Sequence, residues 1–349
     1  MRANSFAFAA CGLAIVAAQD LATALAGHAS LSTLVALLGQ VSNTTDFLAS
    51  QENVTLFAPS DDAFATIVQS GGIFSIDRAS VDPGLIEQIL RYHLYRGVTR
   101  SVDITTAPQF VHGYLNYSGF VLDGEVSGSN VTGGQVVSVN LDAEDNAIVT
   151  SGVKATSNVV VADIAFDNGI IHIIDKLLLI PLSISETLIT GNFTALAGAA
   201  TQAGVVPTLE GLSDVTIFCP NNDAFQKIAG GTANITDEQL AEILQYPVVQ
   251  GTVGYSTLLS NTSLPTQRGE DVKITVTEDG AVFVNSARVI HVIDEVLNPA
   301  KPNASPVEND STSTMATSLA TFVPFTSGIQ PETSVYSELT QTTSFVAAG

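Results

Sequence analysis

Two strings of residues occur twice in this chain, in the same order each time. Residues 54–64 read V-T-L-F-A-P-S-D-D-A-F, and residues 215–225 read V-T-I-F-C-P-N-N-D-A-F. A second pair follows each of them, I-I-H-I-I-D-K-L-L-L-I-P at 170–181 and V-I-H-V-I-D-E-V-L-N-P at 289–299. Two motifs that recur in order indicate a tandem duplication. Because the period is too long for a solenoid, each copy is expected to have its own core.

The first string predicts a buried strand that turns directly into a helix. Apolar and β-branched residues favour the strand, and the proline ends its pairing. Ser60 and Asn221 are then expected to be N-caps, and the acidic residues after them suit the positive end of a helix rather than a ligand site. The residues assigned to this corner are Phe57, Pro59, Asp62 and Phe64 in the first copy and Phe218, Pro220, Asp223 and Phe225 in the second.

The second string predicts a buried strand that carries one histidine and one aspartate. His172 and Asp175 in the first copy have the same spacing as His291 and Asp294 in the second. Positions three apart on a strand point to opposite faces, so these pairs are not expected to touch. With no nucleophile motif beside it, each histidine is interpreted as a hydrogen-bonded structural group rather than a catalytic base.

Charge and motif content argue against several classes of function. The chain has 12 basic and 34 acidic residues, a net charge of −22, which disfavours nucleic acid and anionic membranes as partners. It contains no G-x-S-x-G, H-E-x-x-H, P-loop or C-x-x-C motif, so we expect no enzyme, metal or cofactor. The acidic cluster at 142–145 is interpreted as a solvated hairpin turn in preference to a calcium site.

These motifs resemble those of the fasciclin (FAS1) family, in a secreted tandem two-domain form of fungal type. The family also carries a Tyr-His pair after an apolar helix, here Tyr92 and His93, and Pro247 replaces the histidine in the second copy. The resemblance covers about residues 20–300. It implies an α+β fold in which each domain is a β-wedge or sandwich decorated with helices. It also implies adhesion, with Tyr92 and His93 as the candidate contact; the alternative is that both residues pack the helix end against the sheet.

The chain divides into four parts by composition. Residues 1–18 resemble a signal peptide, with an apolar stretch too short to span a bilayer. Residues 19–181 and 182–300 hold the two copies. Residues 301–349 are rich in Ser and Thr and are expected to form a disordered, O-glycosylated stalk. The final S-F-V-A-A-G does not support a lipid anchor.

An exported protein is also indicated by N-glycosylation motifs. Cys219, the one cysteine beyond the leader, is expected to be a small buried group. The nine candidate glycosylation sites are Asn43, Asn53, Asn116, Asn130, Asn192, Asn234, Asn261, Asn303 and Asn309.

Helices are predicted first and strands afterwards in each copy, which is typical of the α+β class. The expected helices cover 21–25, 31–38 with Ser30 as N-cap, 83–92, 184–196, and 237–246 with Thr236 as N-cap. The expected strands cover 135–141, 147–150, 158–165, and a hairpin over 272–285. The first copy is longer than the second, and its extra segment, residues 101–134, is interpreted as a glycosylated surface insertion.

The leading functional hypothesis is a secreted adhesion, matrix or cell-wall protein that binds surface proteins or wall glycans without catalysis. The alternative is a secreted module that binds a small apolar ligand or a polysaccharide fragment, and a well-formed apolar pocket would favour it. A weaker third option is hydrolysis of wall glycans.

Overall fold

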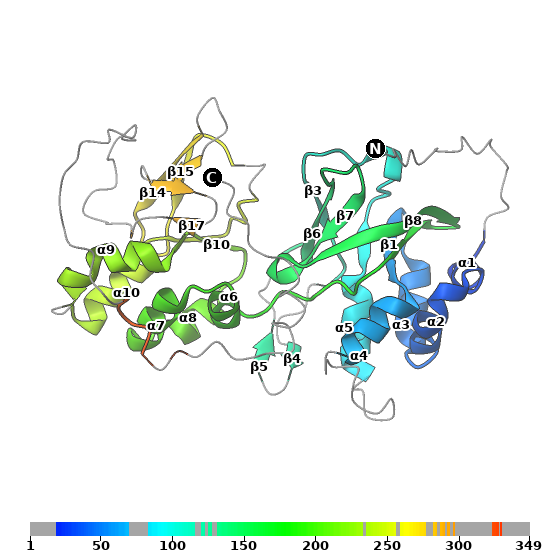
Figure 1. Ribbon diagram of the computed structural model, residues 1–349, viewed down its shortest axis with the longest axis horizontal. Helices are drawn as coiled ribbons and strands as arrows, with labels where there is room; N and C mark the ends of the chain where they lie inside the picture. Colours follow the sequence, from blue (N-terminus) through cyan, green and yellow to red (C-terminus); the bar gives the residue numbers. More distant parts are fainter. Residues whose placement is uncertain are drawn as a thin grey trace, which may run out of the picture.

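The computed structural model contains two domains that lie side by side (Figure 1). It describes residues 19–69, 83–115, 120–122, 125–127, 131–232, 235–255, 259–276, 282–284, 287–289, 292–293, 296, 323–327 and 329.

Domain 1 is built on a seven-stranded sheet with the order β2-β1-β9-β8-β7-β6-β3. All neighbouring strands are antiparallel except β1 and β9, which are parallel. Every residue of β1 is buried, as expected for a parallel strand covered on both faces. The strands are β1 (Val54–Pro59), β2 (Leu94–Arg96), β3 (Gln109–His112), β6 (Val136–Leu141), β7 (Ala147–Thr150), β8 (Thr156–Phe166) and β9 (Gly169–Ile174).

The parallel pair explains why two separate strings recur together. The first string forms β1 and the second forms β9, and Phe57 lies opposite His172 in their register. In the second copy Cys219 pairs with Val292 and Pro220 with Ile293, which is the same register. The two motifs of each copy are therefore neighbours in space, and in domain 1 they form the second and third strands of the sheet.

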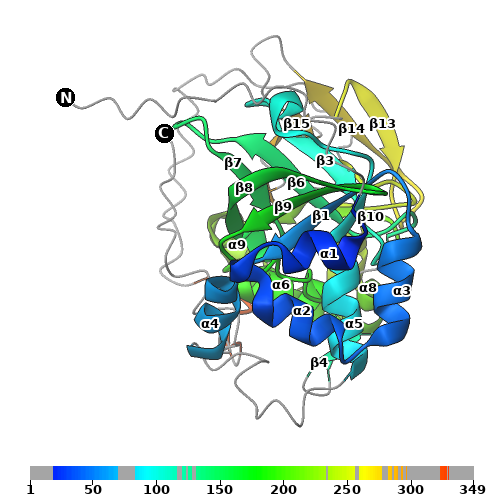
Figure 2. The same cartoon turned by 90° about the vertical axis from the view of Figure 1, so that its right-hand side faces the viewer.

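Helices cover the sheet of domain 1 and enclose its core. They gather below the strands in Figure 2, and their apolar faces pack against β1 and β9. The helices are α1 (Leu21–Ala26), α2 (Ser32–Leu38), α3 (Ser42–Ser50), α4 (Asp61–Gln69) and α5 (Pro83–Tyr92), with short 3-10 turns at Ala29–Leu31, Ser101–Asp103 and Gly152–Lys154.

Domain 2 repeats this architecture with shorter strands. Its sheet has the order β11-β17-β16-β15-β14-β13, and β10 pairs with β12 beside it, so the strand order matches that of domain 1. The strands are β10 (Val215–Ile217), β11 (Cys219–Pro220), β12 (Val248–Gln250), β13 (Thr262–Pro265), β14 (Asp271–Val276), β15 (Val282–Val284), β16 (Ala287–Val289) and β17 (Val292–Ile293). The helices are α6 (Ile184–Thr190), α7 (Thr194–Gln202), α8 (Val206–Glu210), α9 (Asn222–Thr232) and α10 (Asp237–Gln245).

Most expected elements are present, with two differences. Thr236 caps α10 in a capping box as predicted, whereas Ser30 lies inside the 3-10 turn Ala29–Leu31 and the N-cap position of α2 is Leu31. The helix expected over 184–196 is two helices, because Asn192 adopts a φ of 62° and breaks it. The surplus of the first copy lies around β3 and includes a two-stranded ribbon, β4 (Phe120–Leu122) and β5 (Glu125–Ser127).

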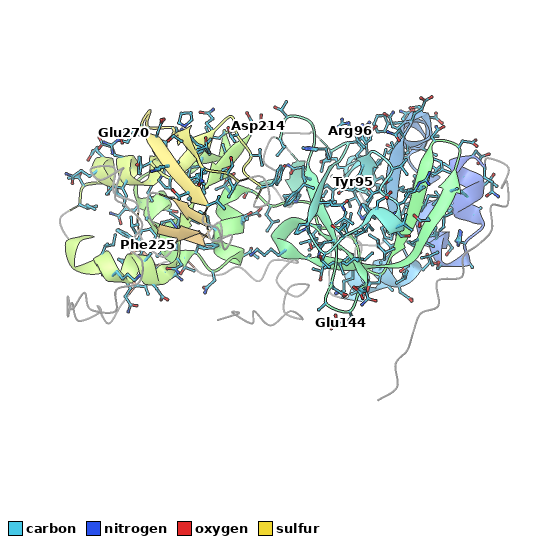
Figure 3. All side chains as sticks on the ribbon, turned by 90° about the horizontal axis from the view of Figure 1, so that it is seen from above. Tyr95, Arg96, Glu144, Asp214, Phe225 and Glu270 are labelled. Atoms are coloured by element: carbon cyan, nitrogen blue, oxygen red, sulfur yellow. The ribbon has the colours of Figure 1, made fainter. Side chains whose placement is uncertain are left out.

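The two domains touch at the outer edge of the first sheet. The ring of Phe110 in β3 stacks on Tyr255 of domain 2, with centroids 4.6 Å apart. Asp214 lies on the side of domain 2 that faces domain 1 (Figure 3), and its carboxylate accepts hydrogen bonds from Thr132 N and Oγ1 at 2.7 and 2.5 Å. These contacts cover an edge strand that would otherwise be open to pairing.

Part of the Ser/Thr-rich tail differs from the expected stalk. Val323, Phe325 and Ile329 pack against the helical core of domain 2. This tail segment, residues 323–327 together with Ile329, lies beside α7 in Figure 1. The expectation of an extended chain is thus wrong for the tail segment, because its apolar side chains find an apolar surface.

Within the part of the chain that the structure describes, no helix has the length and apolar character needed to cross a bilayer.

Candidate functional site

The strand-to-helix corner is held by the residues that follow the proline. In the first copy Ser60 caps α4 by accepting a hydrogen bond from Ala63 N at 3.2 Å, and in the second Asn221 accepts one from Ala224 N at 2.8 Å. Both caps were expected from the sequence. Phe64 and Phe225 are buried behind them, so each corner joins the sheet to the helical core.

The next residue of the corner has a role that sequence reasoning missed. Asp61 accepts hydrogen bonds from Thr33 N at 2.7 Å and Ser32 Oγ at 2.8 Å, so it caps α2 rather than its own helix. In domain 2 the Asn222 side chain accepts one from Ala195 N at 3.0 Å. The available signal in the sequence was that a residue with a side-chain acceptor, Asp61 or Asn222, recurs at this position of both copies.

Tyr92 and His93 lie in the interior of domain 1, with 0% and 1% of their surfaces exposed. His93 Nδ1 donates to Ile89 O at 2.7 Å, and its Nε2 accepts from Leu178 N at 3.0 Å. Burial lowers the pKa of His93 to about 4, so the imidazole is neutral near pH 7. Neither side chain can reach a partner in this conformation, and both pack the end of α5 against the sheet, which was the alternative reading.

His172 is also buried and bonded to backbone. Its Nε2 donates to Thr99 O at 2.8 Å, its Nδ1 accepts from Asp163 N at 3.3 Å, and its ring stacks on Phe57. Burial lowers the pKa of His172. Asp175 is turned away from it and accepts hydrogen bonds from Asn158 N and Nδ2, both at 2.7 Å. The two motif residues therefore do not pair, as the strand geometry predicted.

The second copy keeps the same frame with different side chains. Phe218 N donates to Pro247 O at 3.0 Å, just as Phe57 N donates to His93 O. Proline can replace His93 here because this contact uses only the backbone carbonyl. His291 and Asp294 lie outside the described residues.

Other polar and acidic side chains of the described residues bear on whether a metal or acid–base site is present. The described residues contain no group of three or more His, Cys, Asp or Glu side chains placed to hold a metal ion. Asp142 instead closes the β6–β7 hairpin by accepting from Glu144 N and Asn146 N at 2.9 and 2.8 Å, and Glu144 lies at the periphery in Figure 3. Cys219 is half-buried, and burial raises its pKa to about 12, so its thiol is a weak nucleophile.

Four of the candidate glycosylation sites lie in the described part of the chain, and all four asparagines are exposed: Asn43, Asn53, Asn192 and Asn261. The other five, Asn116, Asn130, Asn234, Asn303 and Asn309, lie outside it.

Each domain has a groove between its first three helices. The domain 1 groove has a volume of about 520 Å³ and its lining includes Leu21, Leu25, Val35, Leu38, Thr45 and Asp46. The domain 2 groove retains only about 40 Å³, and its lining includes Ile184, Leu188, Ala197, Ala200, Val206 and Leu209. Ile329 of the tail segment also lines this second groove. The duplicated fold thus carries one large groove, in domain 1, and one much smaller groove, in domain 2, whose lining includes a residue of the tail segment.

Comparison with known proteins agrees with the duplicated architecture. A fasciclin domain model matches residues 29–181 and again 191–299. The chain is 37% identical to a fasciclin-like arabinogalactan protein of Arthroderma benhamiae over 320 residues, which are 87% of this chain and 73% of that protein. It is 31% identical to the fasciclin-like arabinogalactan protein elcF of Phaeosphaeria nodorum, over 81% of this chain and 90% of that one.

A solved FAS1 domain pair from the insect cell adhesion molecule Fasciclin I also matches, with a TM-score of 0.36 and 18% identity over 79% of this chain and 99% of that one. With the family model matched twice and the curated relatives matched over most of their length, the chain belongs to the fasciclin domain family and carries two copies of its domain in tandem.

Proposed function

We propose that this protein is an extracellular adhesion or cell-wall protein that acts by binding surface proteins or wall glycans, without catalysis. Membership of the fasciclin family supports adhesion, which the family resemblance implies. Two of its relatives carry a polysaccharide, arabinogalactan, in their names, which supports a place at the wall.

The observation that carries the proposal is the placement of His93 and His172. Both histidines are buried, and their ring nitrogens bond to backbone groups. Side chains that a hydrolase would need in a cleft are here used to join strands and helices. In contrast, the exposed face of domain 1 presents Asn43 and Asn53, where attached glycans would face the solvent.

The test uses the secreted full chain, with and without enzymatic removal of its N-glycans. Binding to cells, to isolated wall polysaccharides and to immobilised copies of itself is measured side by side, together with release of sugars from the same polysaccharides. Saturable binding without sugar release supports the proposal. Sugar release that depends on the protein would contradict it, as would the absence of binding in every arm.

A second candidate function is binding of a small apolar ligand in the domain 1 groove. Its volume of about 520 Å³ lies in the range of ligand pockets, and its lining includes leucine and valine side chains. Asp20 and Asp46 add carboxylates to the lining, which would suit a ligand with a hydrogen-bond donor or a positive group.

A neutral fluorescent apolar dye tests this candidate. Val35→Glu places a charge in the groove wall, and we expect it to abolish dye binding; the control Val102→Glu changes a valine that is 79% exposed outside the groove. Equal dye binding by both variants and the wild type would contradict a ligand site there.

A further inference from the structure

The tail segment makes a specific apolar contact with domain 2. The ring of Phe325 meets Phe225 of the corner motif edge-on, with centroids 6.0 Å apart and planes at 83°. Figure 3 shows Phe225 within domain 2, so the contact reaches the core rather than the rim. Ile329, four residues further on, completes the lining of the domain 2 groove. Thr326 donates its hydroxyl to Val323 O at 3.1 Å and its carbonyl accepts from Ile329 N at 3.3 Å, so it joins the two ends of the segment.

Gly198 marks the point of closest approach. A Cβ atom at this position would overlap the carbonyl oxygen of Phe325. Gly198 is not among the residues with a positive φ, so its backbone would accept any side chain. Glycine weakens a helix interior relative to alanine. The close approach of the tail segment is therefore what requires glycine here.

Helix α7 is buried on more of its surface than α2, its counterpart in domain 1. Six successive residues, 195–200, are buried in α7, whereas in α2 only Leu34 and Leu38 are. Thr33 and Ala195 make the same bond to the corner, so they are equivalent positions of the two helices. By this alignment exposed Ala36 of α2 is equivalent to Gly198 of α7. A helix that is apolar all round needs a second covering layer, and the tail segment supplies it.

The conformation of the tail segment is maintained by this contact. Phe325 has a φ of 66°, a region that bulky side chains avoid. Such an outlier persists where surrounding contacts compensate for it. The tail segment thus has a backbone conformation that depends on docking, and we do not expect a free peptide of the same sequence to keep it.

We infer that the surface formed by Gly198, Phe225 and the adjoining domain 2 groove is a peptide-binding site whose ligand is the tail segment of this chain, and that neighbouring copies exchange this segment. The family model ends at residue 299, so the ligand lies outside the part of the chain that defines the family. Attachment in one chain gives the segment an effective concentration on the order of millimolar. Docking within one copy therefore prevails in dilute solution, and exchange occurs where copies are crowded.

This inference names a second copy of the chain as a partner and thereby rests on the proposed adhesion function for its biological role. Its chemistry can be tested separately, because the groove and its ligand can be disabled in different molecules. Phe325→Ser removes the side chain that packs on Phe225 and leaves the binding site intact. Gly198→Ala blocks the binding site and leaves the tail segment free, while alanine strengthens the helix itself. Gly230→Ala in α9 is the matched control, since no atom lies within 4 Å of the added Cβ.

The experiment mixes full-length F325S and G198A proteins and measures mass by sedimentation, with limited proteolysis of the tail as a second readout. We expect each variant alone and G230A to be monomeric, and the mixture to form a one-to-one complex. The double variant G198A/F325S should join neither partner. Protease should cut the tail of G198A faster than that of the wild type or G230A.

Two outcomes would overturn the inference. One is a mixture that stays monomeric at every concentration although the tail of G198A is released. The other is a G198A tail as protected as that of the wild type, because Gly198 would then not govern docking. Neither outcome touches the adhesion proposal, which fails only if the wild-type protein binds neither cells nor wall polysaccharides nor itself.

Discussion

His93 accepts a hydrogen bond from the backbone N–H of Leu178 at 3.0 Å, and this bond connects the end of α5 to the segment that follows β9. The same imidazole donates to Ile89 O inside α5. Because both ring nitrogens are used and the residue is 1% exposed, His93 acts as a structural link between two parts of the recurring motif.

The burial of His93 predicts a pH dependence of stability. Its pKa is about 4 in the folded protein and about 6.5 when unfolded, so the unfolded chain takes up the proton first. The contribution of His93 is fully present above pH 6.5 and is lost as the pH falls through 4, on the order of 3 kcal/mol in total. The measurement is the free energy of unfolding in urea between pH 7 and pH 4.

His93→Gln isolates this effect, because carboxylates titrate equally in both proteins. We expect the variant to be less stable at pH 7 and to lose less stability toward pH 4. His28→Gln, at a half-buried histidine near the surface, is the matched control and should follow the wild type. Parallel curves for the wild type and His93→Gln would contradict the burial of a neutral imidazole.

The bonds of Asp61 to α2 predict that its carboxylate contributes more to the free energy of unfolding than the neighbouring carboxylate of Asp62. Asp61→Ala removes the cap of α2 at Thr33 N and should lower the free energy of unfolding by about 1–2 kcal/mol. Asp62→Ala, at an exposed position in the same helical turn, should cost only about 0.5 kcal/mol. Asp61→Asn should retain most of the stability, since Asn222 makes this bond in domain 2. Equal losses for Asp61→Ala and Asp62→Ala in chemical denaturation would count against this role.

Cys219 predicts slow thiol chemistry. Because burial raises its pKa to about 12, little thiolate exists at pH 8, and labelling by a thiol reagent should be slow in the native protein and fast in denaturant. Cys219→Ala should abolish this labelling in protein without residues 1–18, which contain Cys11, and should cost little stability, since the first copy has Ala58 at this position. Rapid labelling of the native wild type would show that the thiol is accessible.

The sequence predicted local features well because their causes are local. Ser60 and Asn221 follow a proline at the end of an apolar run, which is enough to predict a strand, a corner and a cap. The opposite faces of His172 and Asp175 followed from the two-residue period of a strand.

What the sequence did not reveal depends on residues far apart in the chain. No local pattern indicates that β1 pairs with β9, since Val54 and Gly169 are brought together only by folding. The bond from Thr33 to Asp61 is of the same kind. Phe325 lies among Ser and Thr residues, so composition predicted a stalk, and only the small residues of α7 hinted at a covering segment.

We propose that the recurring polar side chains support the architecture and leave binding to exposed surfaces. The most direct test is His93→Ala, with thermal unfolding and binding to cells and wall polysaccharides measured on the same samples. Loss of the bond to Leu178 should lower the melting temperature by roughly 5–10 °C, and binding by the folded protein should be unchanged. An unchanged melting temperature together with lost binding would contradict a structural role for His93.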